Sequence, residues 1–454
     1  MRVTQSNLIW FPKEDCSAEF IRGMRFSNLV QRKSFDDSEG TKYQMMRETE
    51  SAYGVPISYG RSVAKTHGLH IENKGAAAQV IYEEIPMPRQ GQRQFFNEIC
   101  NTLQNHSVCL AVAGTGVGKT VAALNAIAKT KSRALVIVPS RSLAEQWKQE
   151  AINHLRCETG EIGILDGSSK DVGAERKIVV AVIHSLVDKP IVKDLRDSFQ
   201  MVVFDECHRV PANTFSRVPY LFNPLYRLAL SATPERRDGA SGLALNHFGF
   251  IAEHVVYCEA EAMPVWFFPL AIDCTVKSPS WGNRTMRLSK TLSALAENAT
   301  YNATLISVIN HAARHGRTCL VLSDRISHLE ALKAGVEVEH ENTALFIGKT
   351  TKAQFAELKE KAQVIFATYG VMKEGVDIPR LDWGMDATPR VEGVQAIGRI
   401  RRRLIGKPIP IWVTPHIESN EMLNGIFHAR KRDYIKCGAE QIKSLAEYKA
   451  RLSR

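Results

Sequence analysis

The sequence has no hydrophobic run long enough to cross a membrane, since its longest apolar stretches, such as Ala134–Val138, have only the length of a strand. The first residues, MRVTQSNLIWFPKED, lack the apolar segment of a secretory signal. Nine cysteines, an odd number without any Cys-x-x-Cys pair, argue against a disulfide framework and against a zinc ribbon. These absences predict a cytoplasmic protein with neither a zinc site nor a membrane partner.

Wholesale disorder is also excluded, because 44% of the 454 residues are hydrophobic and 24% are charged. The net charge of +11 is unevenly distributed. Residues 1–88 carry 11 basic and 11 acidic side chains, whereas residues 390–454 carry 14 basic and 6 acidic ones. A basic C-terminal end favours a polyanionic partner, but a solvated helix face would give the same composition.

From about residue 105, short β-branched runs alternate with helical stretches, which is typical of a parallel α/β sheet. Strands are predicted at Val108–Ala113, Ala134–Pro139, Lys177–Ile183, Met201–Asp205 and Tyr226–Ser231. After a Pro-containing region the alternation resumes, with a helix at Leu292–His315 and strands at Thr318–Ser323, Ala344–Ile347, Val364–Ala367 and Ile409–Val413. The sequence therefore predicts two α/β lobes of about 150 residues each.

The same pattern suggests domain boundaries. We expect a small N-terminal module at 1–88, a first lobe at 89–255, a linker at 256–299, a second lobe at 300–418 and a basic helical tail at 419–454. Trp10, Phe11, Tyr43, Tyr53 and Tyr59 are interpreted as the small core of the module rather than as a base-stacking platform. The tail would either grip nucleic-acid phosphates or pack its apolar side on the second lobe.

A glycine-rich turn, Ala113-Gly-Thr-Gly-Val-Gly-Lys-Thr120, follows the first apolar strand and precedes a helical run. In that context Gly114, Thr115, Gly116, Val117 and Gly118 present backbone N–H groups to phosphates. Lys119 would reach the β- and γ-phosphates, and Thr120 would ligate Mg²⁺. The alternative is a glycine turn without a ligand, and the strict pattern has Gly where Ala113 stands.

A second polar element ends the strand Met201-Val-Val-Phe-Asp-Glu-Cys-His208. Asp205 stands at the carboxyl end of this strand, where a parallel sheet places ligands, and is predicted to hold Mg²⁺. Glu206 would orient and deprotonate the attacking water. Paired carboxylates alone are usually surface charge, but here they follow an apolar strand and a phosphate-binding loop.

These two elements resemble superfamily 2 helicases with a DExH box, here Asp205-Glu-Cys-His208. Further motifs follow in the family order over residues 89–403, beginning with Arg89-Gln-Gly-Gln92 and Pro139–Trp147. The remaining motifs are Ser231-Ala-Thr-Pro-Glu-Arg-Arg-Asp-Gly239, Thr368 through Gly375-Val-Asp377-Ile-Pro379, and Gln395-Ala-Ile-Gly-Arg399-Ile-Arg-Arg402. The resemblance implies two RecA-like lobes and the use of ATP and Mg²⁺. Val182 and Gly91 depart from the pattern, because the family often has Thr and an aromatic residue there.

The resemblance also implies roles for individual residues. Catalysis would involve Lys119, Asp205 and Glu206 together with Gln395, Arg399 and Arg402, the two arginines reaching the γ-phosphate. Arg89 and Gln92 would bind the adenine base, and Gly375 and Asp377 would sense the nucleotide. Contacts to the nucleic acid, or coupling of those contacts to ATP, would involve Arg141, His208, Ser231, Thr233 and Thr368.

The coupling motif at Ser231–Gly239 is most similar to that of branch-migrating DNA members, the UvsW-like bacteriophage helicases and the RecG and XPB groups. That similarity implies an ATP-dependent DNA helicase acting on forks and junctions in replication, recombination or repair, in the cytoplasm of a bacterium or a phage-infected host. A DExH RNA helicase and an ATP-gated nucleic-acid clamp remain as alternatives.

Overall fold

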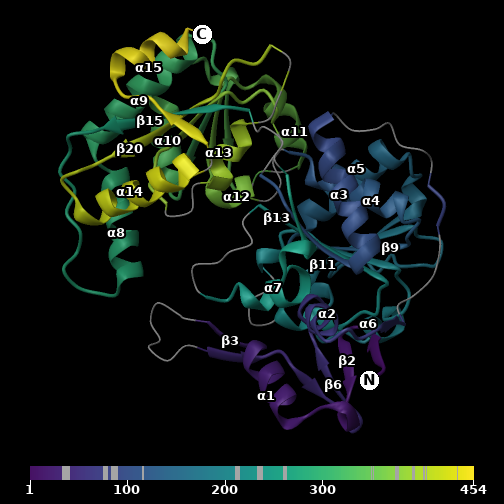
Figure 1. Ribbon diagram of the computed structural model, residues 1–454. Helices are drawn as coiled ribbons and strands as arrows, with labels where there is room; N and C mark the ends of the chain where they lie inside the picture. The colour runs from purple at the N-terminus through teal and green to yellow at the C-terminus, as the bar shows by residue number, and fades with distance from the viewer. Residues whose placement is uncertain are drawn as a thin grey trace. The chain divides into compact units, whose positions relative to one another are not determined.

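The computed structural model describes residues 1–32, 41–74, 80–82, 90–114, 117–209, 215–232, 239–258, 263–348, 350, 352–373, 378–390, 394–401, 404, 406–436 and 438–453. The chain divides into two compact units, Met1–Ala260 and Glu261–Arg454, and each has its own sheets and core (Figure 1). In the described part of the chain, no helix is both long and apolar enough to span a bilayer.

The first unit contains a seven-stranded parallel sheet in the order β10-β11-β9-β12-β13-β8-β14. Its strands are β8 (Val108–Val112), β9 (Ala134–Val138), β10 (Ile162–Leu165), β11 (Ile178–Val182), β12 (Met201–Phe204), β13 (Tyr226–Ser231) and β14 (Val255–Tyr257). The helices are α3 (Gln90–His106), α4 (Lys119–Lys129), α5 (Arg141–Leu155), α6 (Ile191–Leu195) and α7 (Gly242–Phe248). The five predicted strands of this lobe are confirmed; β10 and β14 were not predicted.

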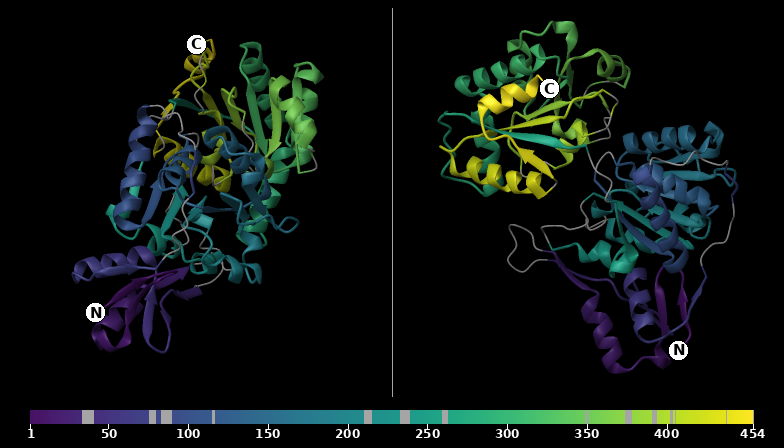
Figure 2. Two further views of the ribbon diagram at one scale, coloured as in Figure 1. Left: turned by 90° about the vertical axis from the view of Figure 1, so that its right-hand side faces the viewer. Right: turned by 45° about the horizontal axis from the view of Figure 1, so that its top comes forward.

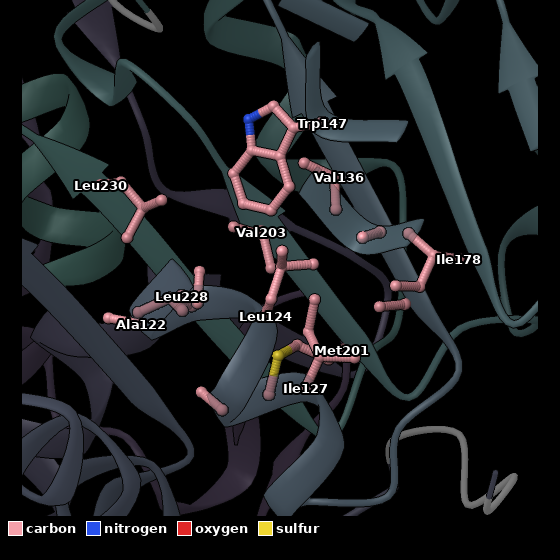
Figure 3. Close-up of a cluster of buried hydrophobic side chains, with 14 of the residues drawn as sticks. Ala122, Leu124, Ile127, Val136, Trp147, Ile178, Met201, Val203, Leu228 and Leu230 are labelled. Atoms are coloured by element: carbon pink, nitrogen blue, oxygen red, sulfur yellow. The ribbon is translucent and has the colours of Figure 1, made fainter. Parts of the chain in front are cut away.

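The strands of this sheet are apolar on both sides because each face is covered. Helices α3, α4 and α5 pack on one face, where Trp147 of α5 meets Val136 and Val203 from neighbouring strands (Figure 3). The opposite face packs against α7 and the N-terminal segment. Such two-sided burial is typical of parallel sheets.

The N-terminal module, defined here as described residues 1–74, forms a mixed sheet in the order β5-β6-β2-β1-β7 and a separate hairpin, β3 with β4. Its elements are β1 (Val3–Gln5), β2 (Ile9–Pro12), α1 (Ala18–Ser27), β3 (Leu29–Arg32), β4 (Thr41–Gln44), β5 (Arg47–Glu48), β6 (Ala52–Val55), α2 (Ile57–Thr66) and β7 (Ile71–Asn73). Helix α2 packs so closely on β2 that a Cβ at Gly60 would lie 2.5 Å from the Cβ of Ile9. Only glycine permits that approach.

The module is not independent of the first lobe. Val3, Ile9 and Phe11 belong to the same hydrophobic cluster as Leu110 and Leu135 of the parallel sheet. The core interpretation of the aromatic residues is confirmed for Phe11 and Tyr59, which are buried, while Trp10, Tyr43 and Tyr53 are half-buried. One continuous core therefore joins the module to the lobe within the first unit.

The second unit repeats the architecture, with a parallel sheet in the order β17-β18-β16-β19-β20-β15-β21. Its strands are β15 (Val265–Ala271), β16 (Cys319–Ser323), β17 (Thr343–Phe346), β18 (Val364–Thr368), β19 (Trp383–Asp386), β20 (Ile411–His416) and β21 (Ala439–Gln441). The helices are α8 (Arg284–Ala296), α9 (Ala299–Arg314), α10 (Ile326–Gly335), α11 (Lys352–Lys361), α12 (Tyr369–Lys373), α13 (Val394–Ile400), α14 (Glu421–Lys436) and α15 (Leu445–Leu452). They cover both faces of the sheet (Figure 2). The prediction of two tandem α/β lobes is thus confirmed.

Three details of the second unit differ from the expectation. The stretch 256–299 is not only a linker, because β15 lies inside the sheet between β20 and β21. The single helix expected at Leu292–His315 is two helices, because the side chain of Asn298 accepts a hydrogen bond from Tyr301 N and caps α9. The segment 419–454 is helical as predicted, but it also contributes β21 to the sheet.

A buried charged pair fastens α14 to the second sheet. Arg430 of α14 lies 2.7 Å from Asp386 of β19, and both side chains are 0% exposed. Asp386 also accepts hydrogen bonds from Tyr369, Trp412, Thr414 and Tyr434. The sequence left open whether the tail at 419–454 binds phosphates or packs on the second lobe. The buried position of Arg430 favours packing.

Candidate nucleotide site and coupling residues

The glycine-rich turn joins β8 to α4 at the carboxyl edge of the first sheet. Gly118 has a φ of +99° and immediately precedes α4, a backbone conformation that residues other than glycine rarely adopt. Lys119 Nζ donates to Ala113 O at 2.8 Å and to Gly114 O at 3.2 Å, so its ammonium group lies over the loop. Thr120 is partly exposed on the first turn of α4. Thr115 and Gly116 lie outside the described residues.

Gln92 at the start of α3 contacts the backbone of this turn. Its Nε2 donates to Val117 O at 2.7 Å, and a Cβ at Gly118 would lie 2.6 Å from the same nitrogen. The structure therefore brings Gln92 to the phosphate loop, where it supports the backbone. Arg89, the other residue expected to bind the base, lies outside the described residues.

Asp205 follows β12 and is held from two sides. Trp147 Nε1 donates to Asp205 Oδ2 at 2.8 Å, and Glu206 N donates to Asp205 Oδ1 at 2.9 Å. Burial, with a smaller contribution from the charge of Glu206, raises the pKa of Asp205 to about 6, although Trp147 and Lys119 oppose this shift. The sequence reasoning did not assign a role to Trp147, because its contact with Asp205 spans 58 residues and no local pattern marks it.

Glu206 and Ser231 both lie close to the same ring nitrogen of His208. His208 Nδ1 lies 3.2 Å from Glu206 Oε2 and 3.4 Å from Ser231 Oγ at the end of β13. Glu206 has a φ of +52°, a left-handed conformation that costs about 1–2 kcal/mol in a residue other than glycine. The structure thus connects the predicted general base to the first residue of the coupling motif through one imidazole. Thr233 lies outside the described residues.

The carboxylates suit a divalent cation. Two acidic groups adjoin each other at the strand end, and burial together with the charge of Glu206 raises the pKa of Asp205, so a cation beside it would be favourable. The described residues contain no cluster of three or more His, Cys, Asp or Glu able to hold a metal ion. Mg²⁺ bound with nucleotide needs only one or two protein ligands, because phosphates and water supply the others. Thr120 and Asp205 are the residues that would hold it.

Arg141, predicted to contact nucleic acid, begins α5. Its Nη1 lies 2.9 Å from Asp166 Oδ2, and the same nitrogen donates to Ser168 Oγ. The side chain is about half exposed and is oriented by the loop after β10. Its orientation is therefore fixed by an ion pair while part of the guanidinium still faces solvent.

The remaining predicted residues belong to the second unit. Thr368 is partly buried at the end of β18, and Arg399 is partly buried on α13. Gln395 lies on the same helix, but nothing is described of its side chain. Gly375, Asp377 and Arg402 lie outside the described residues. Arg401, which lies between Arg399 and Arg402 in the sequence, donates a hydrogen bond from Nε to Met263 O at 2.9 Å. This contact helps to fix the end of α13.

Comparison with known families matches residues 85–236 to the family described as "Type III restriction enzyme, res subunit". The putative helicase 161L of Invertebrate iridescent virus 6 is 28% identical over 416 residues, covering 86% of this chain and 89% of the viral protein. The DNA 3'-5' translocase XPB2 of Sulfurisphaera tokodaii is 35% identical over 130 residues, 29% of this chain and 28% of the archaeal protein.

A solved structure supports the fold. The helicase domain of Hef from Pyrococcus furiosus superposes with a TM-score of 0.53 at 15% identity, covering 76% of this chain and 98% of that one. At this identity the match speaks for the fold, and the fold is that of two tandem RecA-like lobes.

Proposed function

We propose that this chain, an ATP-dependent superfamily 2 helicase, unwinds or branch-migrates forked and junction DNA. It is similar to an XPB translocase, and its coupling motif resembles that of the UvsW-like helicases. The observation that carries the proposal is the position of His208 between Glu206 and Ser231. These contacts link the general base to the coupling motif, so a change at the nucleotide can reach the motif that would drive strand movement. The choice of DNA is supported by the 35% identity to a DNA translocase.

The proposed hydrolysis starts from the contacts within the phosphate loop. Lys119 exchanges the carbonyls of Ala113 and Gly114 for the β- and γ-phosphates of ATP, which are stronger acceptors because they are charged. Thr120 and Asp205 would hold Mg²⁺, whose charge would offset that of the phosphates. Gln92 keeps the turn in place through Val117 O and has a second amide atom with which to bind the adenine base.

Glu206 is the proposed general base. It takes a proton from the water that attacks the γ-phosphorus, and the P–O bond to the leaving ADP breaks. When Glu206 gains that proton, its attraction for His208 Nδ1 weakens and the imidazole is left with Ser231 as its partner. The state of the nucleotide is thereby reported to the motif that begins at Ser231.

The resemblance supplies the proposed roles in the second unit. Gln395, Arg399 and Arg402 would meet the charge that develops on the γ-phosphate, an effect worth about 10³–10⁵ in rate in related nucleotide hydrolases. Gly375 and Asp377 would respond to the nucleotide, and Thr368 would contact the strand. Arg141 and Thr233 would complete the contacts from the first unit. Acting in replication, recombination or repair would follow from a preference for branched DNA.

The test is a substrate panel. ATP hydrolysis and strand separation are measured with single strands, duplexes, forks and four-way junctions, each made as DNA and as RNA. We expect forked and four-way DNA to stimulate hydrolysis most and to be remodelled. A preference for RNA would replace the proposal by an RNA helicase, and ATP-dependent binding without strand movement would replace it by a clamp.

Lys119→Ala provides the site control, and Lys129→Ala at the exposed end of the same helix removes an equal charge away from the loop. Hydrolysis should be lost in Lys119→Ala and retained in Lys129→Ala. Turnover in Lys119→Ala would overturn the assignment of the nucleotide site.

A further inference from the structure

An open cavity of about 300 Å³ lies in the first unit between the N-terminal module, the end of α3 and the segment that precedes β14. It is lined by Arg61, Ala64, Lys65, Leu69, His70, Ile71, His106, Ile251 and His254. Five of these side chains carry a cationic or imidazole group, and none carries a carboxylate. The lining therefore suits an anionic ligand with some apolar surface.

Arg61 is the central cation of this cavity. Its Nε donates to Gln5 Oε1 at 2.8 Å, and Gln5 itself is 0% exposed. Within the described ranges no carboxylate lies at ion-pair distance from Arg61, and burial lowers its pKa to about 10, which leaves it charged at neutral pH. A partly buried cation without an acidic partner is unfavourable, and a bound anion would offset that cost.

The other polar groups do not neutralise Arg61. Lys65 lies one turn along α2, but its Nζ pairs with both carboxylate oxygens of Glu253 at 2.6 Å. His254 Nδ1 lies 2.7 Å from Ser58 Oγ, and its ring is 4.9 Å from that of His106. Burial lowers the pKa of both rings, that of His254 to about 3, so both offer N–H donors without adding charge.

We propose that this cavity binds a phosphate group, carried by a nucleic-acid backbone or by a small phosphorylated molecule. The Arg61 guanidinium presents a planar fork that matches two phosphate oxygens, and imidazole N–H groups supply further donors. Leu69, Ile71 and Ile251 provide the apolar surface on which a sugar rests. The volume exceeds what a phosphate alone needs.

The cavity is distinct from the proposed nucleotide site. His106 ends α3 and Gln92 lies near its beginning, so at 1.5 Å per residue the two side chains originate about 20 Å apart along the helix. The proposal does not depend on the identity of the nucleic acid that the helicase moves.

The first experiment uses the full chain labelled with ¹³C at the histidine Cε1 and inorganic phosphate as the probe. Phosphate should shift the resonances of His70 and His106 in the wild type and in Arg22→Gln, a control that removes an exposed charge from the same module. In Arg61→Gln the shifts should be lost. Phosphate-induced shifts that persist in Arg61→Gln, or that are absent from the wild type, would overturn the proposal.

The second experiment separates the two sources of phosphate. Binding of a 20-base-pair DNA duplex without ATP is measured against salt concentration, where each phosphate contact adds about 0.9 to the slope of log K against log [salt]. A slope lower by about that amount in Arg61→Gln assigns the cavity to the DNA backbone. An unchanged slope in Arg61→Gln, with phosphate-dependent shifts that are present in the wild type and lost in this variant, assigns it to a small phosphorylated molecule.

Because Arg61 is partly buried, a third variant guards against misfolding. His70→Gln changes an exposed lining residue and cannot disturb the core. It should weaken the phosphate-dependent shift of His106 while leaving the melting temperature unchanged. If the phosphate-dependent shift of His106 is the same as in the wild type in both folded His70→Gln and folded Arg61→Gln, phosphate binds outside this cavity.

Discussion

At the scale of single residues, the end of β12 in the first unit combines a strained backbone with an unusual ionisation. Glu206 has a left-handed backbone, and the pKa of the adjacent Asp205 is raised to about 6. Strained conformations persist only where surrounding contacts hold them, as Trp147 and His208 do here. The arrangement costs free energy in the absence of a ligand, and a bound cation would offset part of that cost.

His208→Ala should uncouple hydrolysis from strand movement. The substitution removes the group between Glu206 and Ser231 but leaves both carboxylates in place. A coupling of about 1–3 kcal/mol corresponds to a five- to 150-fold effect, so we expect at least fivefold less DNA unwound per ATP hydrolysed. His154→Ala on α5 is the matched control. An unchanged ratio of unwinding to hydrolysis in His208→Ala would refute the coupling role.

Asp205→Asn should stabilise the protein in the absence of Mg²⁺ and nucleotide. Because the pKa of Asp205 is raised from 3.8 to about 6, the folded state binds more protons than the unfolded state between those values. Wild-type stability therefore falls as pH rises through that window, and the penalty is fully present above about pH 6. Melting temperatures in EDTA should be higher for Asp205→Asn at pH 8 and should converge toward pH 4. A lower melting temperature of the variant at pH 8 would contradict this.

At the scale of elements, site residues were predictable from the sequence wherever the strand and the loop that follows it contain the complete motif. Lys119 and the Asp205-Glu206 pair were predictable because each directly follows an apolar strand. Trp147 and Arg61 were not, because their contacts join distant segments. Such contacts leave no periodicity in the sequence.

The strand β15 was not predicted because of its composition. It contains Pro269, which lacks the N–H that an interior strand normally donates. The structure tolerates this proline because β21 pairs only with Val265–Phe267, so the ladder on that side has ended before Pro269. The polar three-residue β21 gave no strand signal of its own, and its place in the sheet follows from packing.

The Asp386–Arg430 pair gives α14 its importance to the second unit. Arg430→Met leaves the Asp386 carboxylate buried without a cation, and breaking a buried pair costs about 3–5 kcal/mol. We expect that loss in the free energy of unfolding, measured with denaturant, and no such loss in Arg432→Met on an exposed position of the same helix. The double variant Asp386→Asn with Arg430→Met, which removes the uncompensated charge and keeps an acceptor oxygen for the neighbouring donors, should recover part of it. Equal stability of Arg430→Met and wild type would contradict the assignment.

At the scale of the whole molecule, each unit has hydrophobic clusters on both faces of its own sheet. The first unit includes the N-terminal module in one of those clusters, so the module acts as a cover for the sheet as well as a candidate ligand site. The N-terminal module is therefore needed for the first unit to form its complete core.

Two fragments test that statement. Residues 1–260 should melt cooperatively and bind ATP, whereas residues 89–260 should not fold, because they lack Val3, Ile9 and Phe11 and expose the sheet face that these residues cover. Circular dichroism during heating measures both. A cooperative transition of 89–260 at the same temperature as 1–260 would show that the module is dispensable.

The position of β15 has a consequence during synthesis on the ribosome. Trp266, Phe267 and Phe268 emerge early, yet Phe267 pairs with Trp412 of β20, which is translated about 145 residues later. At about 5–20 residues per second, this strand waits roughly 7–30 s for its neighbour. An aromatic strand without its partner for that long is a binding site for chaperones, and slower translation of 272–410 would lengthen its exposure. The yield of active protein in a cell should therefore depend on chaperone supply more than its final stability suggests.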